Sequence, residues 1–151
     1  MKLPVFAAIS GALLVGVFTL TGAQALDRPG TVRITDSALR HAHVDVGTDG
    51  KSIGDLDVYT VLLYNKRIRA KAIGQATMTC TVVSATGQSC TATYILPKGT
   101  IVTQGVITSR LIYELAVAGG TGLYSNVRGS LTVTSLNRTS SRELLVFRLS
   151  V

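Results

Sequence analysis

This chain is a succession of short segments rich in β-branched residues, and this pattern limits the folds open to it. Val, Ile and Thr make up 39 of the 126 residues from Leu26 to Val151. These residues favour pleated, half-buried strands, and no window after residue 25 has the period of an amphipathic helix. Gly, Pro, Asn or Ser interrupts the segments, so the chain is predicted to be an all-β sandwich or barrel. The predicted strands are Thr31–Thr35, Ala42–Val46, Leu56–Tyr64, Lys71–Val83, Ser89–Leu96, Thr100–Ile107, Leu111–Ala118, Gly129–Leu136 and Glu143–Ser150.

The last predicted strand is apolar on both of its faces. Leu145 and Phe147 alternate with Leu144 and Val146. A strand of this kind needs cover on both sides, and the interior of a barrel supplies one side only. We therefore expect an oligomer; an N-terminal arm laid over the strand is the alternative.

The two cysteines flank a turn. Ser84–Gln88 lies between Cys80 and Cys90, and folding a hairpin about Ala85 places the two cysteines directly opposite each other. Opposite residues of antiparallel strands have Cβ atoms ~4.5–5.5 Å apart, which is near the separation of a disulfide. A structural disulfide in an oxidising compartment is predicted. A redox or metal-binding pair is disfavoured, because the spacing fits neither Cys-x-x-Cys nor a zinc site.

The N-terminus has the three-part order of a signal peptide. Lys2 is followed by an apolar run over residues 3–20 and by the small-x-small site Ala23-Gln24-Ala25, so cleavage is expected before Leu26. An uncleaved anchor is the alternative, since the run nearly reaches the ~20 residues of a membrane span. The predicted organisation is a signal peptide over 1–25, an N-terminal arm and entry strand over 26–54 and a barrel over 55–151. The protein is expected to be secreted, with no membrane association after cleavage.

The positive charge does not indicate a nucleic-acid partner. Lys and Arg number 15 and Asp and Glu 8, which gives a net charge of +7. However, the basic residues cluster only over 66–71, and the chain has no Trp and only 3 Phe. Nucleic-acid binders need a basic stripe, and single-strand binders also need aromatic stacking platforms.

The segment Gly119-Gly120-Thr121-Gly122-Leu123-Tyr124-Ser125-Asn126-Val127-Arg128-Gly129 is the most informative in the chain. Its glycines allow tight turns with positive φ. It is not a phosphate-binding loop, because no helix follows and no Lys-Ser/Thr pair ends it. The pattern G-G-T-G-x-[FY]-x-x-[AV]-R-G resembles the dirigent and allene oxide cyclase superfamily. Residues 90–101, 44–47 and 63–65 resemble its bacterial secreted members, and the likeness extends over about residues 42–136.

The resemblance implies an all-β fold, an eight-stranded antiparallel barrel that is often a homotrimer and holds an apolar pocket. Cyclases of this group fold a reactive substrate into one conformation, and dirigent members steer the coupling of radicals; neither requires a cofactor or a metal. The expected function is therefore to bind a small lipophilic molecule and guide its cyclisation, isomerisation or stereoselective coupling. The alternative is a non-catalytic secreted barrel that binds a hydrophobic ligand or a protein partner.

The resemblance and the strand patterns together supply candidate site residues. Arg128 matches the arginine of the motif, and Thr121 falls where many dirigent proteins have an acid. Asn65 resembles the end of the first strand of the family, where an acid is common. Glu114 is an acid within a regular strand, where a solvated, outward side chain is the alternative. The proposed catalytic residues are Arg128, Tyr64 and Glu114, and the proposed ligand-binding residues are Asn65, Tyr94, Tyr113, Thr121 and Tyr124.

His41 and His43 have the i, i+2 spacing that places two side chains on one face of a strand. A metal pair needs a third nearby ligand, which the sequence does not supply. Surface histidines are therefore favoured over a metal site.

Overall fold

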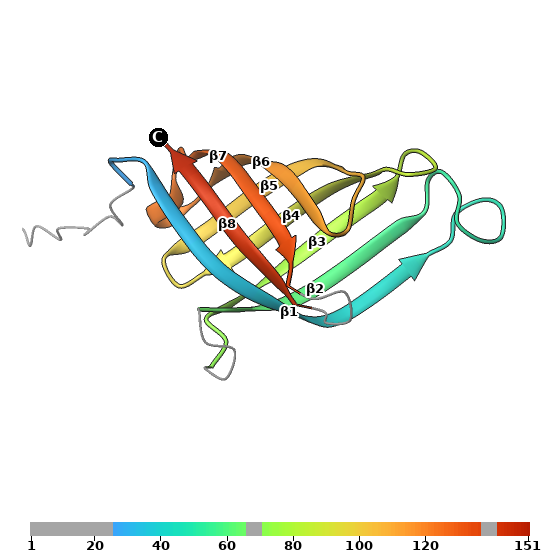
Figure 1. Cartoon of the computed structure of the whole chain (residues 1–151), viewed down its shortest axis with the longest axis horizontal. Helices are drawn as coiled ribbons and strands as arrows, with labels where there is room; N and C mark the ends of the chain where they lie inside the picture. Colours follow the sequence, from blue (N-terminus) through green and yellow to red (C-terminus); the bar gives the residue numbers. More distant parts are fainter. Residues whose placement is uncertain (1–25, 66–70, 137–141) are drawn as a thin grey trace, which may run out of the picture.

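The computed structural model describes residues 26–65, 71–136 and 142–151 and forms a closed barrel (Figure 1). Every strand pairs antiparallel with its neighbours in sequence, and the last strand pairs with the first. The predicted all-β, eight-stranded antiparallel barrel is confirmed. The predicted signal peptide lies outside the described residues. The strands are β1 Gly30–Val44, β2 Leu56–Tyr64, β3 Gly74–Val82, β4 Gln88–Leu96, β5 Gly99–Ile107, β6 Ile112–Gly120, β7 Arg128–Ser135 and β8 Glu143–Ser150, and a short 3₁₀ helix, η1, spans Gly122–Tyr124.

The two strands expected near the N-terminus are one strand, β1, which belongs to the barrel wall. Its first part, Gly30–Thr35, pairs with β8, and its second part, Thr35–Val44, pairs with β2 across an irregularity between Ala38 and Arg40. A bulge of this kind bends a strand and increases its twist. Among the described residues, β1 beyond Thr35 pairs with β2 alone, so β1 and β2 continue past the ends of β7 and β8 (Figure 1).

The β3–β4 hairpin has the predicted register. Cys80 faces Cys90 across the two strands, and the two residues form a disulfide. The pairs on either side, Thr79 with Thr91 and Thr81 with Ser89, carry polar side chains on the outer face. The predicted disulfide and the predicted pairing of the two cysteines are confirmed.

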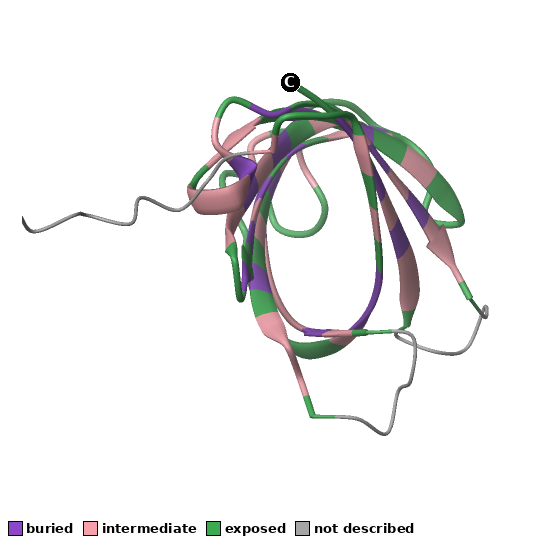
Figure 2. Cartoon of the chain, turned by 90° about the vertical axis from the view of Figure 1, so that its left-hand side faces the viewer, coloured by how far each residue is buried: buried purple, intermediate pink, exposed green. Residues whose placement is uncertain are grey.

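Buried and exposed residues alternate along the strands, as the view along the barrel shows (Figure 2). The apolar inner residues pack most tightly toward the end that carries the β4–β5 and β6–β7 connections, which we call the packed end. Leu63, Ile101, Leu131 and Phe147 are fully buried there. The end that carries the β1–β2, β3–β4 and β5–β6 connections is called the open end.

The Gly-rich segment after β6 lies at the packed end. It contains η1, whose Tyr124 is buried in the core. Gly122 has a φ of +62°, and a Cβ at this position would lie 2.5 Å from the carbonyl oxygen of Lys98. Only glycine fits such a close approach without strain. The motif on which the family resemblance rests therefore lies at the packed end, where Tyr124 packs into the core.

Strand β8 has the predicted apolar pattern on both faces. Leu145, Phe147 and Leu149 are buried inside the barrel, while Leu144 and Val146 on its outer face are partly exposed. Among the described residues, no helix is long and apolar enough to cross a membrane.

Candidate functional site

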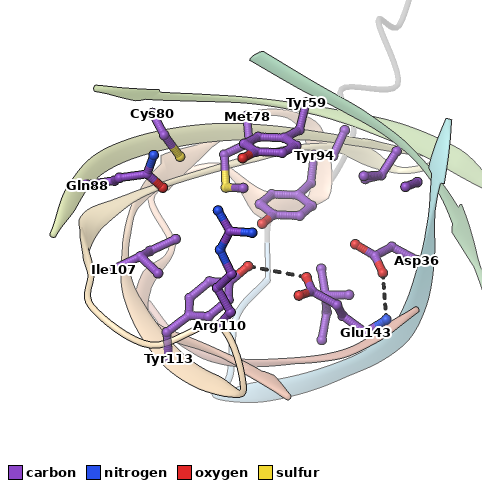
Figure 3. A pocket seen from close by; sticks show the side chains of 14 residues that line it. Asp36, Tyr59, Met78, Cys80, Gln88, Tyr94, Ile107, Arg110, Tyr113 and Glu143 are labelled. Atoms are coloured by element: carbon purple, nitrogen blue, oxygen red, sulfur yellow. Dashed lines mark hydrogen bonds between the residues drawn. The ribbon is translucent and has the colours of Figure 1, made fainter. Parts of the chain in front are cut away.

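A cavity of about 350 Å³ lies inside the barrel toward its open end (Figure 3). This volume falls within the range of pockets that hold small molecules, ~300–1,000 Å³. Most of its wall is apolar or aromatic, and only a few polar groups interrupt it. The lining residues are Asp36, Ala38, Tyr59, Val61, Ala76, Met78, Cys80, Gln88, Tyr94, Ile107, Arg110, Tyr113, Glu143 and Leu145.

Two acidic side chains, Asp36 on β1 and Glu143 on β8, lie together on one wall of the cavity (Figure 3). The last backbone pair between the two strands is Thr35 with Leu144, so Asp36 and Glu143 stand at the next step of the same register. The backbone N–H of Glu143 donates a 2.8 Å hydrogen bond to Oδ1 of Asp36. The side chain of Asp36 thus binds Glu143 at the point where strand pairing ends.

The surroundings of this acid pair favour the neutral form of Asp36. Only 6% of Asp36 is exposed. Burial, and secondly the charge of Glu143, raise the pKa of Asp36 to about 7. Burial also raises the pKa of Glu143, which a hydrogen bond from Tyr113 partly offsets. Near neutral pH the pair can therefore both give and take a proton.

Two tyrosines stand beside the acids. The Tyr113 hydroxyl donates a 3.3 Å hydrogen bond to Oε2 of Glu143, and the Tyr94 ring packs edge-on against Phe147, with 5.0 Å between the ring centres. Burial raises the pKa of both hydroxyls above the usual tyrosine value, so both remain protonated donors at neutral pH. Tyr94 and Tyr113 are the two predicted ligand-binding residues that line the cavity; ligand binding by them stays a prediction.

The cavity is bordered on another side by a hydrogen-bonded cluster around Asp57 on β2. His41 Nε2 and His43 Nδ1 lie 2.8 and 3.0 Å from Oδ1 of Asp57. Gln88 Nε2 donates to Oδ2 of Asp57 at 2.8 Å. The ring of His41 stacks on that of Tyr59 with 4.5 Å between centres. Because Tyr59 and Gln88 line the cavity, the cluster fixes part of its wall.

Hydrogen bonds within this cluster shift the pKa values of Asp57 and His43. Burial by itself would raise the pKa of Asp57, but hydrogen bonds from His41, His43 and Gln88 outweigh burial and lower it. The hydrogen bond to Asp57 raises the pKa of His43. The two histidines thus share one face of β1, as their spacing predicts; both are exposed at the surface, and both bind the Asp57 carboxylate. In the part of the chain that the structure describes, no group of three or more His, Cys, Asp or Glu side chains is arranged to hold a metal ion.

The remaining predicted site residues do not line the cavity. Glu114 is exposed on β6, pointing to the opposite side from Tyr113 and Leu115, so the solvated alternative describes it correctly. Arg128 is exposed at the start of β7, at the packed end. The structure therefore does not bring the three proposed catalytic residues together. The third of them, Tyr64, is the last residue of β2, and its neighbour Leu63 points into the core.

The other predicted residues also lie at the packed end. Asn65 follows β2 and is exposed. Thr121 Oγ1 lies 2.7 Å from Oγ1 of Thr100 and ties the glycine segment to β5. Tyr124 is buried in the core. These residues lie at the packed end of the barrel, whereas the cavity lies toward the open end.

Sequence reasoning missed both acids of the cavity. Asp36 lies between the two short strands expected near the N-terminus, in a stretch treated as irregular. Glu143 is the first residue of a strand whose later positions are apolar. A signal was nonetheless present, since Asp36 shares the face of Ile34, and Glu143 shares the face of Leu145 and Phe147. An acid on an otherwise apolar strand face is unusual, because unpaired acids are rarely buried.

Comparison with known proteins supports the fold. No protein-family model and no curated protein sequence matches the chain. A solved pyocyanin demethylase is 25% identical over 80% of this chain and 100% of its own, with a TM-score of 0.70. A pterocarpan synthase dirigent protein is 17% identical over 81% of this chain and 83% of its own, with a TM-score of 0.63. An exo-specific intermolecular Diels–Alderase is 15% identical over 80% of this chain and 97% of its own, with a TM-score of 0.64. The chain therefore has the fold of dirigent proteins and of cyclase barrels, as the resemblance implies.

Proposed function

We propose that this protein binds a small, largely apolar molecule inside its barrel and guides the cyclisation, isomerisation or coupling of that molecule by proton transfer. The observation that carries the proposal is the acid pair, Asp36 and Glu143, on the wall of an aromatic cavity. A proton donor or acceptor is most effective when its pKa is near the working pH. Burial of Asp36, which raises its pKa to about 7, meets this condition.

The two acids have complementary roles in the proposal. Neutral Asp36 donates its proton to an oxygen or ring nitrogen of the bound molecule as negative charge develops there. Ionised Glu143 accepts a proton from carbon or from a hydroxyl group. The hydrogen bond from the backbone N–H of Glu143 holds the Asp36 carboxyl group at the start of β8, and in the proposal a proton returns from Glu143 to Asp36 after each turnover.

The rest of the cavity restricts the conformation of the molecule. Tyr59, Met78 and Tyr94 present flat or polarisable surfaces, which suit planar aromatic or conjugated molecules. Fixing one reactive conformer can supply a large part of a rate enhancement. The solved pterocarpan synthase dirigent protein and the Diels–Alderase support a guiding role, and the pyocyanin demethylase supports planar heterocycles as candidate ligands.

Export and assembly are part of the proposal. The Cys80–Cys90 disulfide is compatible with an oxidising, extracellular compartment. We propose that residues 1–25 are removed on export and that the mature protein is a homotrimer. Sequencing the N-terminus of protein recovered from the medium tests the first part: Leu26 is expected as the first residue, and an intact N-terminus would contradict cleavage.

Turnover by matched variants tests the catalytic proposal. Residues 26–151 would be incubated with pyocyanin, with a conjugated polyene epoxide, and with a monophenol plus a one-electron oxidant, and products would be separated on a chiral column. Asp36→Asn and Glu143→Gln are expected to slow any accelerated reaction by about 100-fold or more. Glu114→Gln, which neutralises an exposed acid on the outer face, serves as the control and should react like the wild type.

Two results would contradict the proposal. Full activity in both Asp36→Asn and Glu143→Gln would show that the acid pair takes no part in the chemistry. Binding of these compounds without any change in rate or product would favour the alternative of a non-catalytic binding barrel.

A further inference from the structure

Arg110 brings a permanent positive charge to the mouth of the cavity. It lies in the β5–β6 connection at the open end, and its guanidinium group points into the cavity (Figure 3). Arginine has five N–H donors and does not lose its charge in proteins. Within residues 26–65, 71–136 and 142–151, the ion pairs join His41 and His43 to Asp57, and Arg110 takes part in neither.

The acids of the cavity do not neutralise this charge. Glu143 accepts a hydrogen bond from Tyr113, and Asp36 accepts one from the backbone of Glu143. Among the described residues neither acid forms an ion pair with Arg110, and Arg110 is not among the groups that shift the pKa of Asp36 or Glu143. The cavity therefore has two polar regions of opposite character: the acid pair on one wall and a cation at the mouth.

This separation imposes an orientation on a bound molecule. An anionic group placed beside the acid pair would meet the like charge of ionised Glu143 in a buried position. The same group placed at the mouth would meet the guanidinium, with which carboxylates and phenolates form strong charge-assisted hydrogen bonds. The apolar remainder of the molecule would then lie along Tyr59 and Met78, with its far end at the acids.

We propose that the ligand of this barrel is an amphipathic acid: a planar or conjugated body with an anionic oxygen that Arg110 holds at the mouth. This inference rests on the proposed function and adds the chemical class of the substrate and its direction in the cavity. The reacting atoms are those farthest from the anionic group, because they reach Asp36 and Glu143.

Two fluorescent probes that differ by one anionic group test this inference. They are 8-anilinonaphthalene-1-sulfonate and its neutral counterpart, N-phenyl-1-naphthylamine. Each would be titrated into residues 26–151 and into the variants Arg110→Gln, Arg128→Gln and Ala38→Trp. Arg128→Gln removes one exposed arginine at the packed end and so controls for net charge. Ala38→Trp fills part of the cavity and shows where the probes bind.

The expected result is specific to one probe and one arginine. Arg110→Gln should weaken binding of the sulfonate by about tenfold or more, since a hydrogen bond to a charged group is lost, and should change binding of the neutral probe by less than about twofold. Arg128→Gln should bind both probes as the wild type does, and Ala38→Trp should weaken both.

Equal effects of Arg110→Gln on the two probes, or no effect on either, would overturn the anionic ligand and leave the binding function standing. Failure of the wild type to bind either probe would overturn the proposed binding function, and the inference with it. Sulfonate binding that Arg110→Gln and Arg128→Gln weaken equally would also overturn the inference, because net charge alone would then explain it.

Discussion

The backbone N–H of Glu143 donates a 2.8 Å hydrogen bond to the side chain of Asp36, 107 positions earlier in the chain. The two residues belong to β8 and β1, the pair of strands that closes the barrel. The acid pair therefore exists only when the barrel is closed. Folding and the proposed chemistry depend on the same junction.

The stability of the protein should report the raised pKa of Asp36. The folded-state pKa, about 7, exceeds the ordinary value of 3.8, so the folded protein keeps a proton that the unfolded chain releases. The contribution of this group to stability therefore falls as the pH rises from about 4 to 7. Asp36→Asn removes the titration but can still accept the hydrogen bond from Glu143. The free energy of unfolding of Asp36→Asn, relative to that of the wild type, should therefore be about 2 kcal/mol larger at pH 8 than at pH 5.

Urea unfolding of both proteins at the two pH values measures this difference. Contributions from titrating groups that do not interact with Asp36, such as Asp57 and His43, are common to both proteins and cancel. A gain that does not depend on pH would show that Asp36 titrates normally in the folded state.

The disulfide should contribute to stability through the short loop that it closes. Cys80 and Cys90 are 10 positions apart, and closing a loop of this length is worth about 2.7 kcal/mol in the chain-entropy model. The double variant Cys80→Ala, Cys90→Ala should therefore unfold at a lower urea concentration. A thiol reagent should find no free thiol in the denatured, unreduced protein and two after reduction; two thiols before reduction would contradict the disulfide.

The motif residues at the packed end should affect stability unequally and ligand binding little. Arg128 is exposed, so Arg128→Ala should change the free energy of unfolding by less than about 0.5 kcal/mol. Gly129 has a φ of +131°, and a Cβ there would collide with the carbonyl oxygen of Arg148. Gly129→Ala should cost at least about 2 kcal/mol. Thermal melts with and without N-phenyl-1-naphthylamine compare the two, and loss of probe binding in Arg128→Ala alone would restore Arg128 as a site residue.

The outer surface should support self-association. Leu144 and Val146 on β8 remain partly exposed, and Ile112 on β6 is 58% exposed. Burying such residues against a second copy is favourable. Light scattering on residues 26–151 should report an oligomer, with a trimer expected from the resemblance to dirigent proteins. A monomer at high concentration would contradict this assembly.

The parts of this protein that follow local rules could be predicted from sequence. The β-branched segments identified β3 and β4, and the turn between them placed Cys80 opposite Cys90. The cavity acids follow no local rule, because Asp36 and Glu143 come together only through the pairing of the first and last strands. The bulge in β1 near Ala38 also interrupts the alternation that would have joined its two halves. The glycine motif was a good guide to the fold, but its residues lie at the packed end, whereas the cavity lies toward the open end.

We propose that Asp36 and Glu143 together hold a proton near neutral pH inside the cavity. The most direct test is an NMR titration of the side-chain carboxyl carbons in ¹³C-labelled residues 26–151, with Asp36→Asn and Glu143→Gln used for assignment. Two interacting acids titrate as a pair. We expect one apparent pKa of the pair to lie near 7. Titration of both Asp36 and Glu143 near pH 4 would contradict the account.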